Sequence, residues 1–168
     1  MCNGKKSRLN KIEHNLKILG LYQFVSGIVG ILLCTYFFGS IPFQLLISIG
    51  IYGFCAYCGF LLLKKKYDNG LNLSIINQSL QIISFGVFGF AIKYTSGFYA
   101  GFGIDLTDDL ITRFDFGINT WRLYLNADPD LVFLYVNIIP IFILGFIYRS
   151  KTRLELNNKS ISEIGKSE

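Results

Sequence analysis

Four long runs of the sequence contain no charged residue, and this feature restricts the folds open to the chain more than any other. They cover residues 18–38, 43–63, 71–92 and 131–148. Each has about the length of ~20 residues that a helix needs to cross a hydrocarbon core of ~30 Å. Hydrophobic residues make up 52% of the chain and charged residues 16%, against about 25% charged residues in typical soluble domains. We therefore expect an α-helical integral membrane protein with four transmembrane helices, arranged as a four-helix bundle.

The positions of the basic residues predict an orientation for these helices. Of the 16 Lys and Arg residues, five precede the first run, three stand at 64–66 and five follow the fourth run. Segments on the cytoplasmic side of a membrane are enriched in Lys and Arg. Both termini are thus predicted to be cytoplasmic, in the cytoplasmic (inner) membrane of a bacterium. Basic flanks of this kind favour the lipid bilayer as partner, and they give no reason to expect nucleic acid.

Within the predicted exterior region 93–130, residues 97–126 follow a different pattern, because apolar and polar residues alternate there with a period of two. Such alternation is typical of strands with one apolar face. The parity changes at Asn119-Thr120, which a two-residue hairpin turn would explain. That turn would pair Phe116 with Leu123, and a loop at 107–109 would pair Phe102 with Phe114. The pattern predicts a small extracytoplasmic three-stranded antiparallel β-meander between helices 3 and 4.

The two faces of this meander differ in character. One face would carry charged and small residues, among them Arg113, Asp115, Arg122 and Gly103. The other face is too apolar to lie in water. We expect it to pack onto the mouth of the bundle or into the outer leaflet, and to contact a membrane or extracytoplasmic protein partner. Its candidate interface residues are Phe102, Phe114, Phe116, Trp121 and Leu123.

The two ends of the chain are polar. Residues 1–17 form a basic leader with apolar residues on one helical face, so we expect a short helix lying on the inner membrane surface. Residues 149–168 contain few apolar side chains and no aromatic ring after Tyr148. This composition predicts a disordered cytoplasmic tail.

Polar side chains recur at one depth of the first three predicted helices. They are Gln23 on the first, Tyr57 on the second, and Asn77, Gln78 and Gln81 on the third. Such a layer suits interhelical hydrogen bonds, and it suits a site for a small molecule equally well. The pattern leaves both readings open.

The second predicted helix contains Cys55-Ala-Tyr-Cys58, which has the C-x-x-C spacing of thiol oxidoreductases. Cys58 lies close to the lysines at 64–66 and so near a reducing compartment. Residues 93–130 contain no cysteine that could relay electrons to a substrate outside. Cysteine is also an ordinary small residue of helix interfaces. A redox pair at Cys55 and Cys58 is therefore a minor hypothesis.

Several kinds of chemistry lack the residues they need. The four apolar runs contain no Asp, Glu, Lys, Arg or His, and the chain has a single histidine, His14. We expect no metal site, no cofactor and no catalytic residue, and hence no enzyme. The sequence favours an accessory or scaffold subunit that binds a partner. The alternatives are passive transport or binding of a small neutral or lipophilic molecule, and an intramembrane thiol-redox protein.

Overall fold

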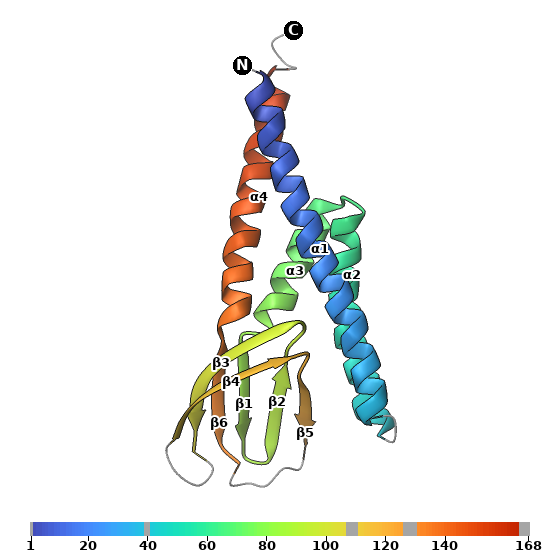
Figure 1. Cartoon of the computed structure of the whole chain (residues 1–168), viewed down its shortest axis with the longest axis vertical. Coiled ribbons are helices and arrows are strands. Elements are labelled where there is room, and N and C mark those ends of the chain that lie inside the picture. Colours follow the sequence, from blue (N-terminus) through green and yellow to red (C-terminus); the bar gives the residue numbers. More distant parts are fainter. Residues whose placement is uncertain (1, 39–40, 107–110, 126–130, 165–168) are drawn as a thin grey trace.

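The computed structural model describes residues 2–38, 41–106, 111–125 and 131–164 of the chain. Within these ranges three helices come first, six strands follow, and a fourth helix ends the chain (Figure 1). The helices are α1 (Cys2–Phe38), α2 (Pro42–Leu63), α3 (Tyr67–Ser79) and α4 (Ile138–Ile164). The strands are β1 (Ile83–Val87), β2 (Phe90–Tyr94), β3 (Phe98–Asp105), β4 (Ile111–Ile118), β5 (Trp121–Tyr124) and β6 (Phe133–Asn137).

Two of the four predicted membrane-spanning runs form helices that could cross a membrane. Residues Asn10–Phe37 of α1 and Pro42–Leu63 of α2 are long and apolar enough to cross a membrane, with mean hydropathies of 1.9 and 2.0. This statement rests on their length and composition. Helix α1 runs unbroken from Cys2, so the leader at 1–17 continues the same helix and does not form a separate one. The segment after residue 149, expected to be disordered, is helical as far as Ile164.

The prediction of four transmembrane helices is wrong for the other two runs, and so is the four-helix bundle. The run 71–92 is divided between α3, β1 and β2, and the run 131–148 between β6 and α4. A short apolar run does not by itself distinguish a buried helix from a strand. Between β1 and β2, Phe88 and Gly89 both have positive φ, at 51° and 78°. Two such residues make the tight turn that joins antiparallel strands, and this turn breaks the third predicted span.

The three-stranded meander is also wrong, because the sheet has six antiparallel strands in the order β4-β3-β6-β1-β2-β5. Its first predicted pair is correct, since β3 pairs with β4 and Phe102 stands opposite Phe114. The predicted hairpin through Asn119-Thr120 does not form: β5 pairs with β2, and Arg122 stands opposite Lys93. The reason is burial, because Trp121 and Leu123 of β5 pack against α1 and α2. The predicted loop at 107–109 lies outside the described residues.

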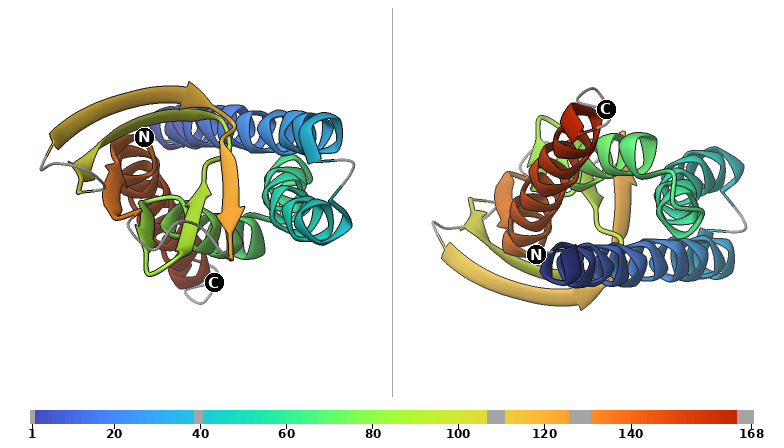
Figure 2. Two further views of the ribbon diagram at one scale, coloured as in Figure 1. Left: turned by 90° about the horizontal axis from the view of Figure 1, so that it is seen from below. Right: turned by 90° about the horizontal axis from the view of Figure 1, so that it is seen from above.

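The sheet curls strongly, so that strands far apart in its order approach one another (Figure 2). Lys93 on β2 forms an ion pair with Asp115 on β4 at 2.5 Å, although three strands separate β2 from β4 in the sheet. The Lys93 ammonium also lies 4.1 Å from the centre of the Tyr99 ring on β3. These contacts define the inner face of the curl, and the register places Gly103 and Arg113 on this face too.

Among the attachments of the sheet to the helices, two involve different parts of the sheet. A core of Cys34, Tyr52, Tyr94, Trp121 and Leu123 joins β2 and β5 to the α1–α2 hairpin. At the other place, β6 ends at Asn137 and α4 begins at the next residue. The Asn137 Oδ1 atom accepts from the backbone N–H of Ile139 in α4 and from that of Ala100 in β3, at 3.2 Å each. One side chain therefore caps a helix and holds a neighbouring strand.

Close contact between α1 and α2 depends on glycine. A Cβ atom at Gly59 would lie 2.4 Å from the backbone N of Phe24 and 2.5 Å from the backbone O of Gly20. Gly53 on the same helix has no atom within 4 Å of the corresponding position. Small residues at helix contacts in membranes allow this kind of approach.

We predict that Gly59→Ala lowers the free energy of unfolding by about 1–3 kcal/mol, because backbone atoms would have to move apart. The matched variant Gly53→Ala should be neutral or stabilising by up to about 1 kcal/mol, since alanine is the better helix former. Denaturant unfolding of both variants in the same detergent tests this. Equal stability of the two variants would contradict the packing described here.

Candidate functional site

A buried group of polar side chains lies where α1, α2 and α3 meet the end of β2. We call it the junction cluster. It comprises Gln23 and Ser26 of α1, Cys55 of α2, Ser74, Asn77 and Gln81 at and just after α3, and Tyr94 and Ser96 at and just after β2. Each of these residues is at most 7% exposed. The cluster thus joins four segments of the chain through side chains that water does not reach.

The Cys55 thiol is at the centre of the junction cluster. Asn77 Nδ2 donates to Cys55 Sγ at 3.3 Å, and the Ser96 hydroxyl lies 3.2 Å from the same sulfur. The thiol itself donates to the backbone carbonyl of Gln23 at 3.5 Å. Sulfur is a weak hydrogen-bonding atom, so these contacts use its full capacity. The arrangement makes Cys55 a link between helices.

Polar residues at and just after α3 form hydrogen bonds with the segment where β2 ends. Gln81 Oε1 accepts from the backbone N–H of Ser96 at 2.8 Å, and the Tyr94 hydroxyl donates to Asn77 Oδ1 at 2.9 Å. Tyr52 of α2 donates to the carbonyl of Thr95 at 2.9 Å. Backbone groups buried outside regular structure need such partners. The cluster therefore supplies hydrogen-bond partners to the segment that leaves the sheet.

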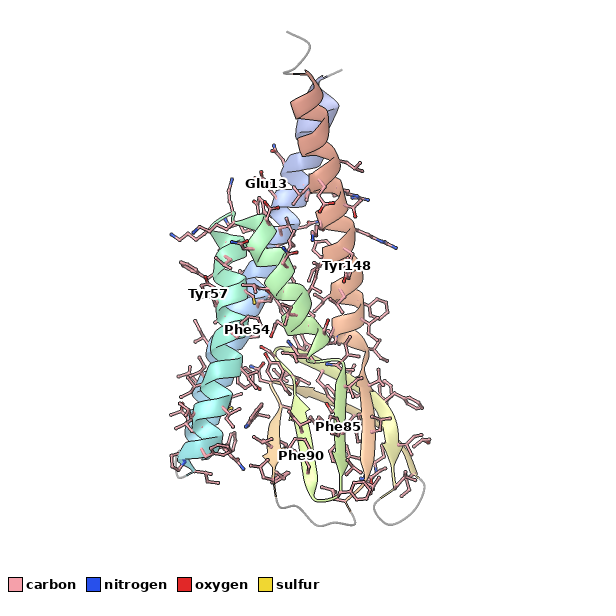
Figure 3. All side chains as sticks on the ribbon, turned by 180° about the vertical axis from the view of Figure 1, so that it is seen from behind. Glu13, Phe54, Tyr57, Phe85, Phe90 and Tyr148 are labelled. Atoms are coloured by element: carbon pink, nitrogen blue, oxygen red, sulfur yellow. The ribbon has the colours of Figure 1, made fainter. Side chains whose placement is uncertain are left out.

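The structure brings four of the five predicted polar-layer residues into the interior. Gln23, Asn77, Gln78 and Gln81 are buried, while Tyr57 is 52% exposed and points away from the other helices (Figure 3). Depth along a helix was the basis of the prediction, and depth does not specify which way a side chain points. Sequence reasoning missed Ser26, Tyr94 and Ser96. The polar residues directly after Lys93 were the signal that could have found the last two.

The two cysteines of the C-x-x-C sequence are both buried, and both are free thiols. Cys55 belongs to the junction cluster, whereas Cys58 contributes no side-chain hydrogen bond to it. The redox hypothesis stays a prediction.

Some buried polar atoms have no hydrogen-bond partner within the described part of the chain. They are Gln23 Nε2, both side-chain polar atoms of Gln78, Ser84 Oγ, Tyr99 Oη, Trp121 Nε1 and Asn137 Nδ2. Native proteins leave few such groups unpaired. These buried atoms are the places where the described part of the fold leaves hydrogen-bonding capacity unused.

The five predicted interface residues fall into two groups. Phe102, Phe114 and Phe116 are 52%, 55% and 71% exposed, whereas Trp121 and Leu123 are 5% and 7% exposed. The two buried residues pack against the helical hairpin, and the three phenylalanines are exposed and contact one another. The apolar face of β3 and β4 is thus directed outward, away from the Lys93–Asp115 pair.

Two hollows lie on opposite parts of the hairpin. The first, about 320 Å³, is lined at the basic end by polar and charged side chains that include Glu13, His14, Lys17 and Lys65. The Glu13 carboxylate lies 3.2 Å from Lys65 Nζ and raises the pKa of this lysine. The second, about 470 Å³, lies between the far end of α1 and the link from β4 to β5. Its lining is Leu33, Cys34, Phe37, Ile118, Asn119, Thr120, Trp121 and Arg122.

Comparison with known proteins identifies no relative from which a function could be inferred. No family model, no curated protein and no solved structure matches the chain. Among the residues that the structure describes, no three His, Cys, Asp or Glu side chains lie close enough together to hold a metal ion.

We predict that Asn77→Ala destabilises the protein by about 1–3 kcal/mol, because Tyr94 and Cys55 would each lose a buried partner. Asn69→Ala, at an exposed position of the same helix, should change stability by less than about 0.5 kcal/mol. Thermal unfolding of the two variants gives the comparison. An Asn77 variant as stable as the Asn69 variant would show that the cluster contributes little.

Proposed function

We propose that this protein is a membrane-embedded accessory subunit that presents a curled β-sheet within the bilayer. In this proposal the α1–α2 hairpin crosses the membrane, and the sheet lies beside the half of the hairpin that is farther from the basic residues. The outer face of the sheet contacts the acyl chains of the lipid. A protein partner in the membrane would be recognised on the same surface.

One observation carries the proposal: the outer face of four adjacent strands is apolar and uncovered. Ten side chains of β1, β6, β3 and β4 on this face are each at least 36% exposed. They are Ile83, Phe85, Phe98, Phe102, Ile104, Phe114, Phe116, Ile118, Leu134 and Val136. Soluble monomers rarely expose a continuous apolar surface of this kind. Charged residues, in contrast, face the inside of the curl.

The position of the sheet beside the hairpin supports lipid as the medium around it. The core that contains Cys34, Tyr52 and Trp121 holds β2 and β5 against α1 and α2. A bilayer that surrounds the hairpin therefore also reaches the sheet (Figure 1). The hairpin itself exposes large apolar side chains to the same surroundings, among them Leu32 at 64% and Leu46 at 71%.

An accessory role fits the use that the chain makes of its polar groups. The Cys55 thiol is occupied by hydrogen bonds, and the Lys93 ammonium is paired with Asp115. These groups stabilise the junction and the curl. The apolar outer face of the sheet is not used in this way, and a surface of this size suits contact with a partner.

Cysteines at two adjacent positions test the placement of the sheet. Phe116 lies on the outer face, and Gly117 on the inner face has room for a side chain, since only Thr120 Oγ1 lies near its Cβ position, at 3.4 Å. A nitroxide attached at Phe116→Cys in lipid vesicles should be relaxed by oxygen, which concentrates in the hydrocarbon. The label at Gly117→Cys should respond less. Strong relaxation of both labels by a water-soluble nickel complex would exclude the lipid-embedded sheet.

The basic residues support an orientation with the hairpin's basic end in the cytoplasm. Lys17 near the start of the hairpin and the lysines at 64–66 lie at this end. Phe88, in the turn between β1 and β2, is 91% exposed at the far end of the sheet. In intact cells an impermeant maleimide should label Phe88→Cys and leave Lys66→Cys unlabelled. The reverse pattern would overturn the orientation.

A further inference from the structure

The hollow between α1 and the β4–β5 link combines features that a lipid-like ligand requires. We call it the Trp121 groove, with the eight lining residues given above. At about 470 Å³ it falls in the size range of small-molecule sites. Leu33, Phe37 and Ile118 give it apolar walls, and Arg122 supplies a positive charge. We propose that the groove binds an amphiphile with an anionic head and an acyl chain.

The charge of Arg122 is the first argument. The sheet has three basic side chains in its described strands. Lys93 and Arg113 each form an ion pair with a carboxylate, and Arg122 forms none within the described ranges. Within the described residues, the Arg122 guanidinium therefore lacks the counter-charge that the other basic side chains of the sheet have. Its planar set of donors matches a carboxylate or a phosphate, to which it can bind through two parallel hydrogen bonds. An anionic head at the mouth of the groove would therefore neutralise this charge.

The Trp121 indole is the second argument. Its side chain is 5% exposed, and its Nε1–H has no acceptor within the described residues. Buried tryptophan N–H groups usually have a partner. Since this nitrogen is buried, an ester or carboxyl oxygen of an amphiphile would pair with it only after the indole turned toward the groove. Arg122 and Trp121 both line the groove but project from opposite faces of β5, so the head and the chain would bind on the two sides of this strand.

The rigidity of the groove wall is the third argument. Asn119, at a φ of 45°, accepts through its side chain from the backbone N–H of Gly97 and donates its own N–H to the Gly97 carbonyl. Thr120 N–H donates to the Thr95 hydroxyl at 2.9 Å. The link between β4 and β5 is thus held by hydrogen bonds to the segment after β2. A wall fixed in advance loses little freedom when a ligand binds.

The test uses the protein's own fluorescence, because Trp121 is the single tryptophan of the chain. The protein is reconstituted in phosphatidylcholine nanodiscs that contain rising fractions of phosphatidylglycerol with brominated chains. Quenching should saturate at low fractions of this lipid, whereas brominated phosphatidylcholine should quench only in proportion to its amount. Brominated oleic acid, added in a separate series, shows whether a free fatty acid binds in place of the phospholipid.

Arg122→Gln should shift the half-saturating fraction about tenfold, the equivalent of one charge-assisted hydrogen bond. Arg113→Gln, on the same inner face but outside the groove, should leave it unchanged. Equal quenching by the two phospholipids together with no saturation by oleic acid would overturn the proposal, and so would equal behaviour of the two variants.

The inference rests on the proposed placement of the sheet in lipid. If the nitroxide at Phe116→Cys meets lipid while quenching shows no anionic preference, the groove alone is refuted. If that nitroxide meets water, the placement is refuted.

Discussion

The ion pair between Lys93 and Asp115 determines which face of the sheet is inside. The two side chains belong to strands that are not neighbours, so they meet only if the sheet curls around them. Lys93 is almost completely buried and also lies over the Tyr99 ring. Asp115 is half exposed, so it supplies the counter-charge while it stays in contact with the surroundings, and opening the pair would leave the buried ammonium without a partner. With Lys93 inside the curl, the register places the phenylalanines of β3 and β4 on the outside.

If the sheet lies in lipid as proposed, its edges need hydrogen-bond partners from the protein, because lipid offers none to unpaired backbone groups. At β5, the Gln44 side chain of α2 donates to the carbonyl of Leu123 at 2.9 Å, and the helices cover Trp121 and Leu123. One edge is therefore protected by the hairpin that anchors the sheet. The same contacts make the hairpin and the sheet a single packing unit.

Part of this fold could be predicted from the sequence because alternation identifies strands wherever one face is apolar. It located β3 and β4 and the pairing of Phe102 with Phe114. It could not show which face is inside, since parity is the same whether the apolar side chains meet a core or a membrane. Strands β1 and β6 were hidden because they lie within long charge-free runs, which also fit a membrane helix. The partner of β5 depended on contacts with helices distant in sequence, which local pattern does not contain.

The candidate sites, too, could be predicted only in part from the sequence. Gln23, Asn77 and Gln81 could be grouped from their spacing on helices, but Tyr57 could not be separated from them without its direction around α2. The Trp121 groove could not be predicted from the sequence, because it forms between the end of α1 and a link that the sequence pattern assigned to a hairpin.

The direct passage from β6 into α4 has a mechanical consequence. Strand β6 lies between β3 and β1, and no loop separates it from the helix. Asn137 holds the first turn of α4 and the neighbouring strand at the same time. A helix joined in this way fixes the direction of the strand that precedes it. Ile147 of α4 packs with Leu16, Leu62 and Leu71 of the other three helices, so the helical core also sets how the middle of the sheet is oriented.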